Sequence, residues 1–97
     1  MTLYTKNEVK DIINEHAIHG ICQTLEDADI KFDLCSADGK QVAASNEPVD
    51  CMNHCTMSID VGGEVWGVLH YDLDADLAFV EGIVLAAQNI LSMAWGA

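Results

Sequence analysis

Two cysteines lie in a polar stretch of the chain, where burial in a core does not account for a thiol. They are Cys51 and Cys55, and three residues separate them. This spacing suits two ligands of one metal ion, and Cys35 ends a predicted strand that could bring a third thiolate to the same place. We therefore expect a cofactor site formed by Cys35, Cys51, Cys55 and His54.

The fourth ligand and the nature of the group stay open at this point. Cys22 and His70 are the candidates for the fourth position, although a small core side chain is the simpler interpretation of Cys22. Four cysteines in 97 residues, with no export signal at the start, more often bind metal or act in redox chemistry than form disulfides. An iron-sulfur cluster, zinc and a thiol switch are all compatible with the pattern. In the metal case, Cys51→Ser or Cys55→Ser should abolish binding and Cys22→Ser should not.

The charge of the chain limits its partners. Sixteen acidic residues against four lysines give a net charge of −12, which repels nucleic-acid phosphates and anionic lipid heads. The first residues contain no basic region followed by an apolar stretch, which favours a cytoplasmic location. The apolar stretch at 77–95 is interrupted by polar side chains, so we interpret it as a buried helix and expect no membrane contact.

The hydrophobic periodicity predicts one domain over residues 1–97, with an α+β fold. A helical pattern covers residues 6–27, and Thr5 is a candidate for its N-terminal cap. Alternating patterns follow in two hairpins, and the second hairpin turns at Gly62-Gly63. Asp74 is the expected cap of a last helix over 75–94. The expected architecture is an antiparallel sheet of two hairpins flanked by N- and C-terminal helices.

The last 40 residues resemble the end of a GAF domain. The similarity lies in Val61-Gly62-Gly63-Glu64-Val65-Trp66-Gly67-Val68-Leu69, in the Asp-rich bend after it, and in the helix with Phe79, Glu81, Leu85 and Ala86. The segment Cys51-Met52-Asn53-His54-Cys55 is also similar to the Cys-containing sensory domains of propanediol-utilisation regulators, which belong to the PAS and GAF group. The resemblance implies a shortened, GAF-like sensory domain.

The last helix is apolar over more of its circumference than one sheet can cover. We expect a homodimer through the two terminal helices, with Val84 and Leu91 in the seam. No phosphate loop or nucleophile motif is present, so we expect no enzyme. The leading hypothesis is an input module for an attached output domain, which senses redox or gas state through a cysteine-ligated metal or iron-sulfur centre. The alternative is a structural zinc or thiol-switch interaction module.

Overall fold

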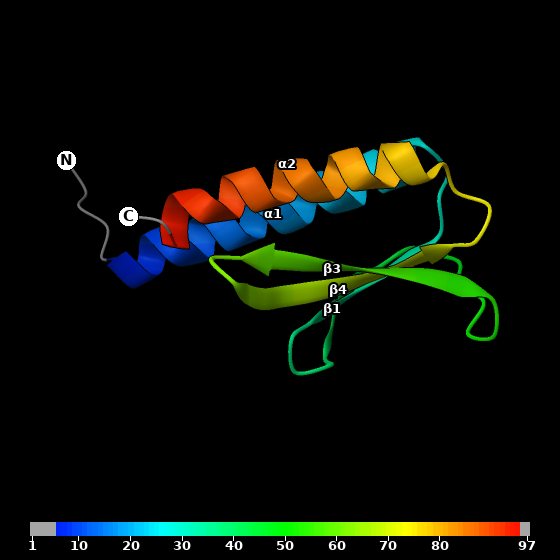
Figure 1. Cartoon of the computed structure of the whole chain (residues 1–97), viewed down its shortest axis with the longest axis horizontal. Helices are drawn as coiled ribbons and strands as arrows, with labels where there is room; N and C mark the ends of the chain where they lie inside the picture. Colours follow the sequence, from blue (N-terminus) through cyan, green and yellow to red (C-terminus); the bar gives the residue numbers. More distant parts are fainter. Residues whose placement is uncertain (1–5, 96–97) are drawn as a thin grey trace.

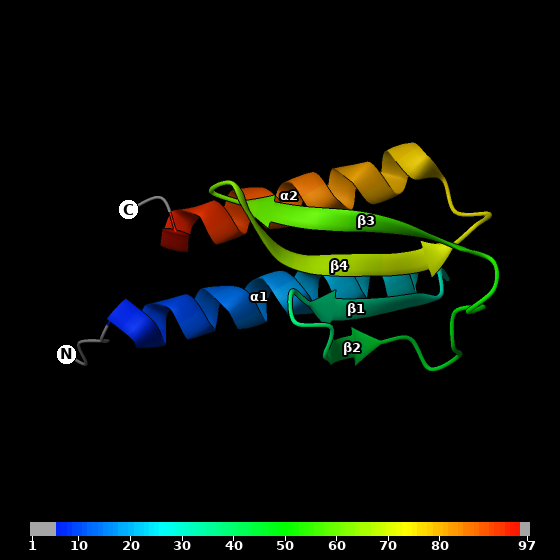
Figure 2. The same cartoon turned by 60° about the horizontal axis from the view of Figure 1, so that its bottom comes forward.

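The computed structural model describes residues 6–95, which form a layer of two helices packed on one sheet (Figure 1). The elements in chain order are α1 (Lys6–Asp27), β1 (Phe32–Ser36), β2 (Gln41–Ala44), β3 (His54–Val61), β4 (Glu64–Asp72) and α2 (Leu77–Trp95). The strands form one antiparallel sheet in the order β2-β1-β4-β3 (Figure 2). The predicted α+β class, with two hairpins between an N-terminal and a C-terminal helix, is confirmed.

The core lies between the sheet and the helices, which run antiparallel on the same face of the sheet (Figure 1). Phe32 and Leu34 of β1 lie opposite Tyr71 and Leu69 of β4, and all four side chains are buried. The alternation predicted for β1 is therefore confirmed, because side chains two residues apart point to the same face of a strand. The opposite face of the sheet carries no helix among the described residues.

The hairpin of β3 and β4 closes with the two-glycine turn that the sequence predicts. Gly62 and Gly63 have φ angles of 60° and 85°, which suit the two central positions of a tight hairpin turn. Two pairs beyond the turn, between Ile59 and Asp60, the register shifts by one residue. Trp66 is the extra, unpaired residue of β4 at this bulge, and its Nε1 donates to Oδ1 of Asn14 on α1 at 3.3 Å.

Gly67 is the position where β4 passes closest to β1. A Cβ atom at Gly67 would lie 2.7 Å from the backbone carbonyl oxygen of Cys35. We expect Gly67→Ala to lower the free energy of unfolding by about 1–3 kcal/mol, the usual cost of forcing extra volume into a packed sheet. Urea denaturation measures this loss. Val65→Ala on the same strand is the control, since Val65 is half exposed and should change stability by less than about 1 kcal/mol.

Two expectations for α2 are wrong. The helix begins at Leu77, and its cap is Asp76 instead of Asp74: Oδ1 of Asp76 accepts the amide of Ala78 at 3.0 Å. Val84 and Leu91 do not lie in an outer seam, because they face the core with 4% and 0% exposure. The helix turns this side toward the sheet, whose apolar face is the larger surface to cover.

The structure also bears on the predicted bounds of α1 and on the predicted burial of α2. α1 spans Lys6–Asp27 as predicted, but its expected cap, Thr5, lies outside the described residues. α2 is long and apolar enough to cross a membrane by length and composition. In the structure it packs on β3 and on α1, and 33% of this apolar stretch is buried.

Candidate functional site

The structure separates the cysteines that the sequence placed in one site. Cys55 of β3 lies opposite Tyr71 and faces the helices, whereas Cys35 of β1 lies opposite Val68 and faces the other side of the sheet. Cys51 is exposed in the loop before β3. Across residues 6–95, no three His, Cys, Asp or Glu side chains gather closely enough to hold a metal ion. The structure does not bring together the thiolate site expected from Cys35, Cys51 and Cys55.

The two cysteines outside that loop are poor candidates for a thiolate ligand. Cys22 is half-buried on α1 and packs against the core, and burial followed by the charge of Glu26 raises its pKa. Burial and the nearby carboxylate of Asp33 also raise the pKa of Cys35. Because the thiolate is the form that binds metal, a raised pKa makes both side chains weaker ligands at neutral pH.

Two histidines meet at the end of the sheet where β3 begins and β4 ends. Nδ1 of His70 lies 3.1 Å from Nε2 of His54, and the ring centroids are 5.0 Å apart. In the register, His54 lies opposite Asp72 and His70 lies opposite Thr56, so the two histidines are diagonal neighbours on the open face of the sheet. Both were predicted as site residues, but their direct contact was not.

The loop before β3 fixes the orientation of His54. Its Nδ1 lies 2.9 Å from the backbone carbonyl oxygen of Asp50. Since a carbonyl only accepts, the neutral ring of His54 carries its proton on Nδ1 and presents the lone pair of Nε2 toward His70. The carboxylate of Asp50 accepts the amide of Met52 at 2.9 Å and the side-chain amide of Asn53 at 3.5 Å, and these bonds hold its pKa below the usual value.

On the other face of the same strands, Cys55 lies beside a buried tyrosine. Burial raises the pKa of Tyr71, and the adjacent Cys55 adds to the effect. The neutral phenol is therefore favoured well above neutral pH. The contact places one of the predicted site thiols against the core, away from His54 on the open face.

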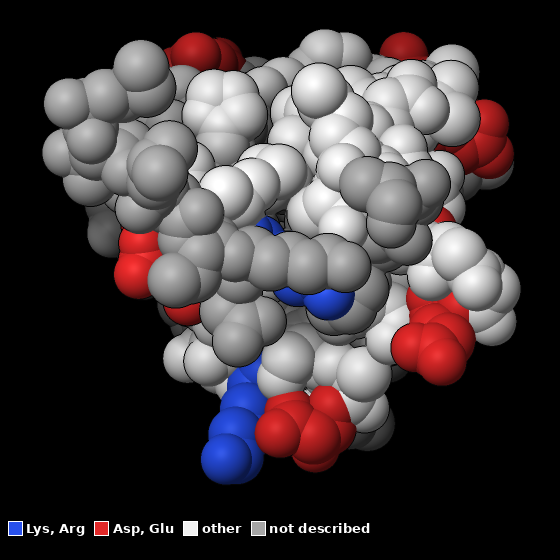
Figure 3. Space-filling view, turned by 90° about the vertical axis from the view of Figure 1, so that its left-hand side faces the viewer, with Lys and Arg blue, Asp and Glu red and all other residues white. Residues whose placement is uncertain are grey.

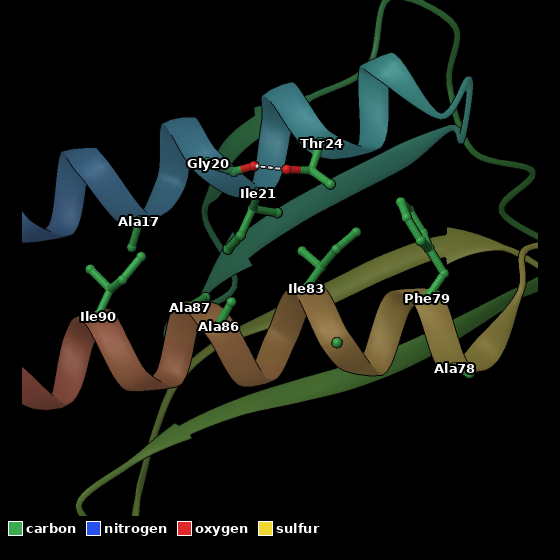
Figure 4. Close-up of a pocket in the computed structure, with 11 residues that line it drawn as sticks. Ala17, Gly20, Ile21, Thr24, Ala78, Phe79, Ile83, Ala86, Ala87 and Ile90 are labelled. Carbon is green, nitrogen blue, oxygen red and sulfur yellow. Dashed lines mark hydrogen bonds between the residues drawn. The ribbon is translucent and has the colours of Figure 1, made fainter.

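A second candidate site is a groove of about 510 Å³ between the helices (Figure 4). Its walls are built mostly from small and aliphatic side chains of both helices. They are Ala17, Gly20, Ile21 and Thr24 of α1, and Ala78, Phe79, Gly82, Ile83, Ala86, Ala87 and Ile90 of α2. The hydroxyl of Thr24, the one polar side chain among them, donates to the carbonyl of Gly20 at 2.7 Å.

The groove contrasts with the acidic character of the chain. None of its lining residues is charged, although the protein carries 16 acidic residues. Acidic side chains are spread around the end of the molecule where α1 begins and α2 ends (Figure 3). The sequence predicted an excess of apolar surface on the last helix, but it did not identify Gly20, Gly82 and Ala86 as the residues that form the groove.

Comparison with known proteins gives no match, either to a protein family, to a curated protein or to a solved structure. The similarity to GAF domains therefore stays a prediction from the sequence pattern.

Proposed function

We propose that the chain is a cytoplasmic sensory input module of a signal-transduction protein, and that it works as a homodimer through its helix layer. The observation that carries this proposal is the uncharged groove between α1 and α2, on the side of the helices that the sheet does not cover. An apolar helix surface of this kind is stabilised when a partner removes it from water.

A second copy of the chain is the partner that fits this surface best. In a twofold arrangement, the α1 and α2 helices of the two copies would form a four-helix bundle and bury both grooves at once. Small side chains such as Gly20, Gly82 and Ala86 let the helices approach closely. The negative charge opposes association, but salt screens it beyond about 8 Å at physiological ionic strength.

The same arrangement supports a route for a signal. β4 is followed by α2 after a connection of four residues, 73–76. A change at the start of β3 and the end of β4 would therefore act on the N-terminal end of α2. The N-terminal end of α1 and the C-terminal end of α2 are both at the opposite end of the molecule (Figure 1), where an attached output domain would receive a shift in helix packing.

The test is the mass of the protein in solution as a function of concentration. Sedimentation and light scattering from about 1 to 100 µM should show a dimer, with dissociation toward the monomer only on dilution. A monomer of 10.5 kDa at every concentration would refute the proposal.

A thiol switch is the alternative, and one observation favours it. Cys51 is exposed and lies four residues from the half-buried Cys55. The same mass measurement, made with and without reductant, separates the two ideas. The sensory dimer through the helices should form under both conditions, whereas a dimer that disappears with reductant would indicate a disulfide between copies.

A further inference from the structure

We propose that His54 and His70 form a binding site for a divalent transition-metal ion. The proposal differs from the thiolate site expected at first, because both protein ligands are imidazoles on the open face of the sheet. The metal ion would be the stimulus that the proposed sensory module detects. Only this signalling role of the metal site rests on the proposed function. The binding itself rests on three features of the pair.

The first feature is the distance between the two ring nitrogens. Nε2 of His54 and Nδ1 of His70 are 3.1 Å apart. Two nitrogens bound to one tetrahedral zinc ion at about 2.05 Å lie about 3.3 Å apart, and ligands at right angles lie about 2.9 Å apart. The observed distance falls between these values, so the two nitrogens need not change their separation to bind one metal ion.

The second feature is the state of the ligand nitrogens. The Asp50 carbonyl holds the proton of His54 on Nδ1, which leaves the lone pair of Nε2 directed at the site. Metal-binding histidines commonly make this hydrogen bond with their second nitrogen, because it fixes the tautomer and the ring orientation. In the metal-free protein Nδ1 of His70 donates to that lone pair. On metal binding this proton moves to Nε2 of His70, which frees the lone pair of its Nδ1 for the metal.

The third feature is the chemistry of the surroundings. Imidazole suits zinc, copper and nickel, whereas calcium and magnesium prefer oxygen ligands. Asp72 lies opposite His54 in the register, and one of its carboxylate oxygens accepts the amide of Lys31 at 3.0 Å. The carboxylate of Asp72, together with the net charge of −12, favours a cation at this end of the sheet. Water or a small exogenous ligand would complete the coordination.

The experiment is titration of the full chain, freed of metal by a chelator, with zinc and then with copper by calorimetry. We expect one site per chain that binds copper more tightly than zinc and does not bind magnesium. Acidification from pH 7.5 to 5.5 should weaken binding, because protons compete for the imidazole nitrogens. No zinc binding up to millimolar concentration would overturn the proposal.

Two variants and one control locate the site. His54→Gln and His70→Asn should each lower zinc affinity at least tenfold, and the Asn amide still donates to His54, so a merely structural hydrogen bond is kept. The double variant His16→Gln, His19→Gln removes the exposed histidines of α1 and should bind zinc as the wild type does. Unchanged affinity in the first two variants, or loss in the control, would contradict the assignment.

A spectroscopic measurement decides the matter if a variant does not fold. Long-range proton-nitrogen NMR spectra of the wild type should show zinc shifting Nε2 of His54 and Nδ1 of His70, with the other ring nitrogens nearly unchanged. The mass of the same samples distinguishes this proposal from the proposed function. Zinc binding by a strict monomer would refute the dimer alone, and a dimer without zinc binding would refute the metal site alone.

Discussion

Val84→Glu should remove a large part of the stability of the native fold. Val84 is 4% exposed and faces the sheet, so the variant would bury a carboxylate among apolar side chains without a partner. An uncompensated buried charge costs about 3–5 kcal/mol, and the added volume costs more. A domain of this size is stable by about 5–15 kcal/mol in total. We expect a large drop in the midpoint of thermal unfolding, which circular dichroism measures.

The neighbouring residue provides the control for this prediction. Leu85 is 59% exposed, so Leu85→Glu adds the same charge to water and should change the free energy of unfolding by less than about 1 kcal/mol. A stable, folded Val84→Glu protein would show that α2 is turned differently about its axis than the structure indicates. If Leu85→Glu destabilised the protein as much as Val84→Glu, the exposure of Leu85 in the structure would be contradicted.

The turn chemistry and the alternating patterns were sufficient to predict the fold class, but not the strand order β2-β1-β4-β3. Gly62-Gly63 and the period of two in β1 and β3 placed the hairpins, and the helical period placed α1 within a residue. The periodicity of the last helix was less informative, because apolar residues lie on two sides of its circumference. Pattern alone does not say which arc faces the sheet, and for this reason Val84 and Leu91 were assigned to the wrong surface.

The contact between His54 and His70 depends on a β-bulge that the sequence pattern does not predict. Val61 lies opposite Glu64 next to the turn, and continuing this register would place His70 opposite Cys55, on one face of the sheet. The bulge between Ile59 and Asp60 shifts the pairing by one residue and places His70 opposite Thr56. His70 then shares a face with His54. One extra residue in one strand thus decides whether an imidazole meets a thiol or a second imidazole.

The two thiols of Cys35 and Cys55 are separated because neighbouring residues of a strand point to opposite faces of the sheet. Cys35 and Cys55 lie on different strands of one sheet, and each faces the side that its position in the register dictates. The sequence placed Cys35 at the end of a strand and Cys55 in a polar loop, whereas Cys55 belongs to β3, and the face of each depends on which residues of β4 lie opposite them. A metal site predicted from cysteine spacing alone therefore could not take into account the face of the sheet on which each cysteine lies.

Ala86→Glu should convert the proposed dimer into a folded monomer. Ala86 lines the groove and is exposed in the single chain, so the added carboxylate reaches water in the monomer. In the twofold dimer it would lie in an apolar interface, once from each copy. We expect the dissociation constant to rise at least about 100-fold, which corresponds to about 2.8 kcal/mol. Sedimentation at a fixed concentration measures the change.

Leu85→Glu is again the matched control, because it adds the same side chain one residue away and outside the groove. Its dimer should dissociate at nearly the wild-type concentration, and both variants should show a native circular dichroism spectrum. If Leu85→Glu dissociates the dimer and Ala86→Glu does not, the copies associate through a different side of α2. The groove would then have to be explained without a second copy of the chain. Three consecutive residues of one helix thus test three separate statements, since Val84→Glu tests the core, Leu85→Glu the solvent face and Ala86→Glu the interface.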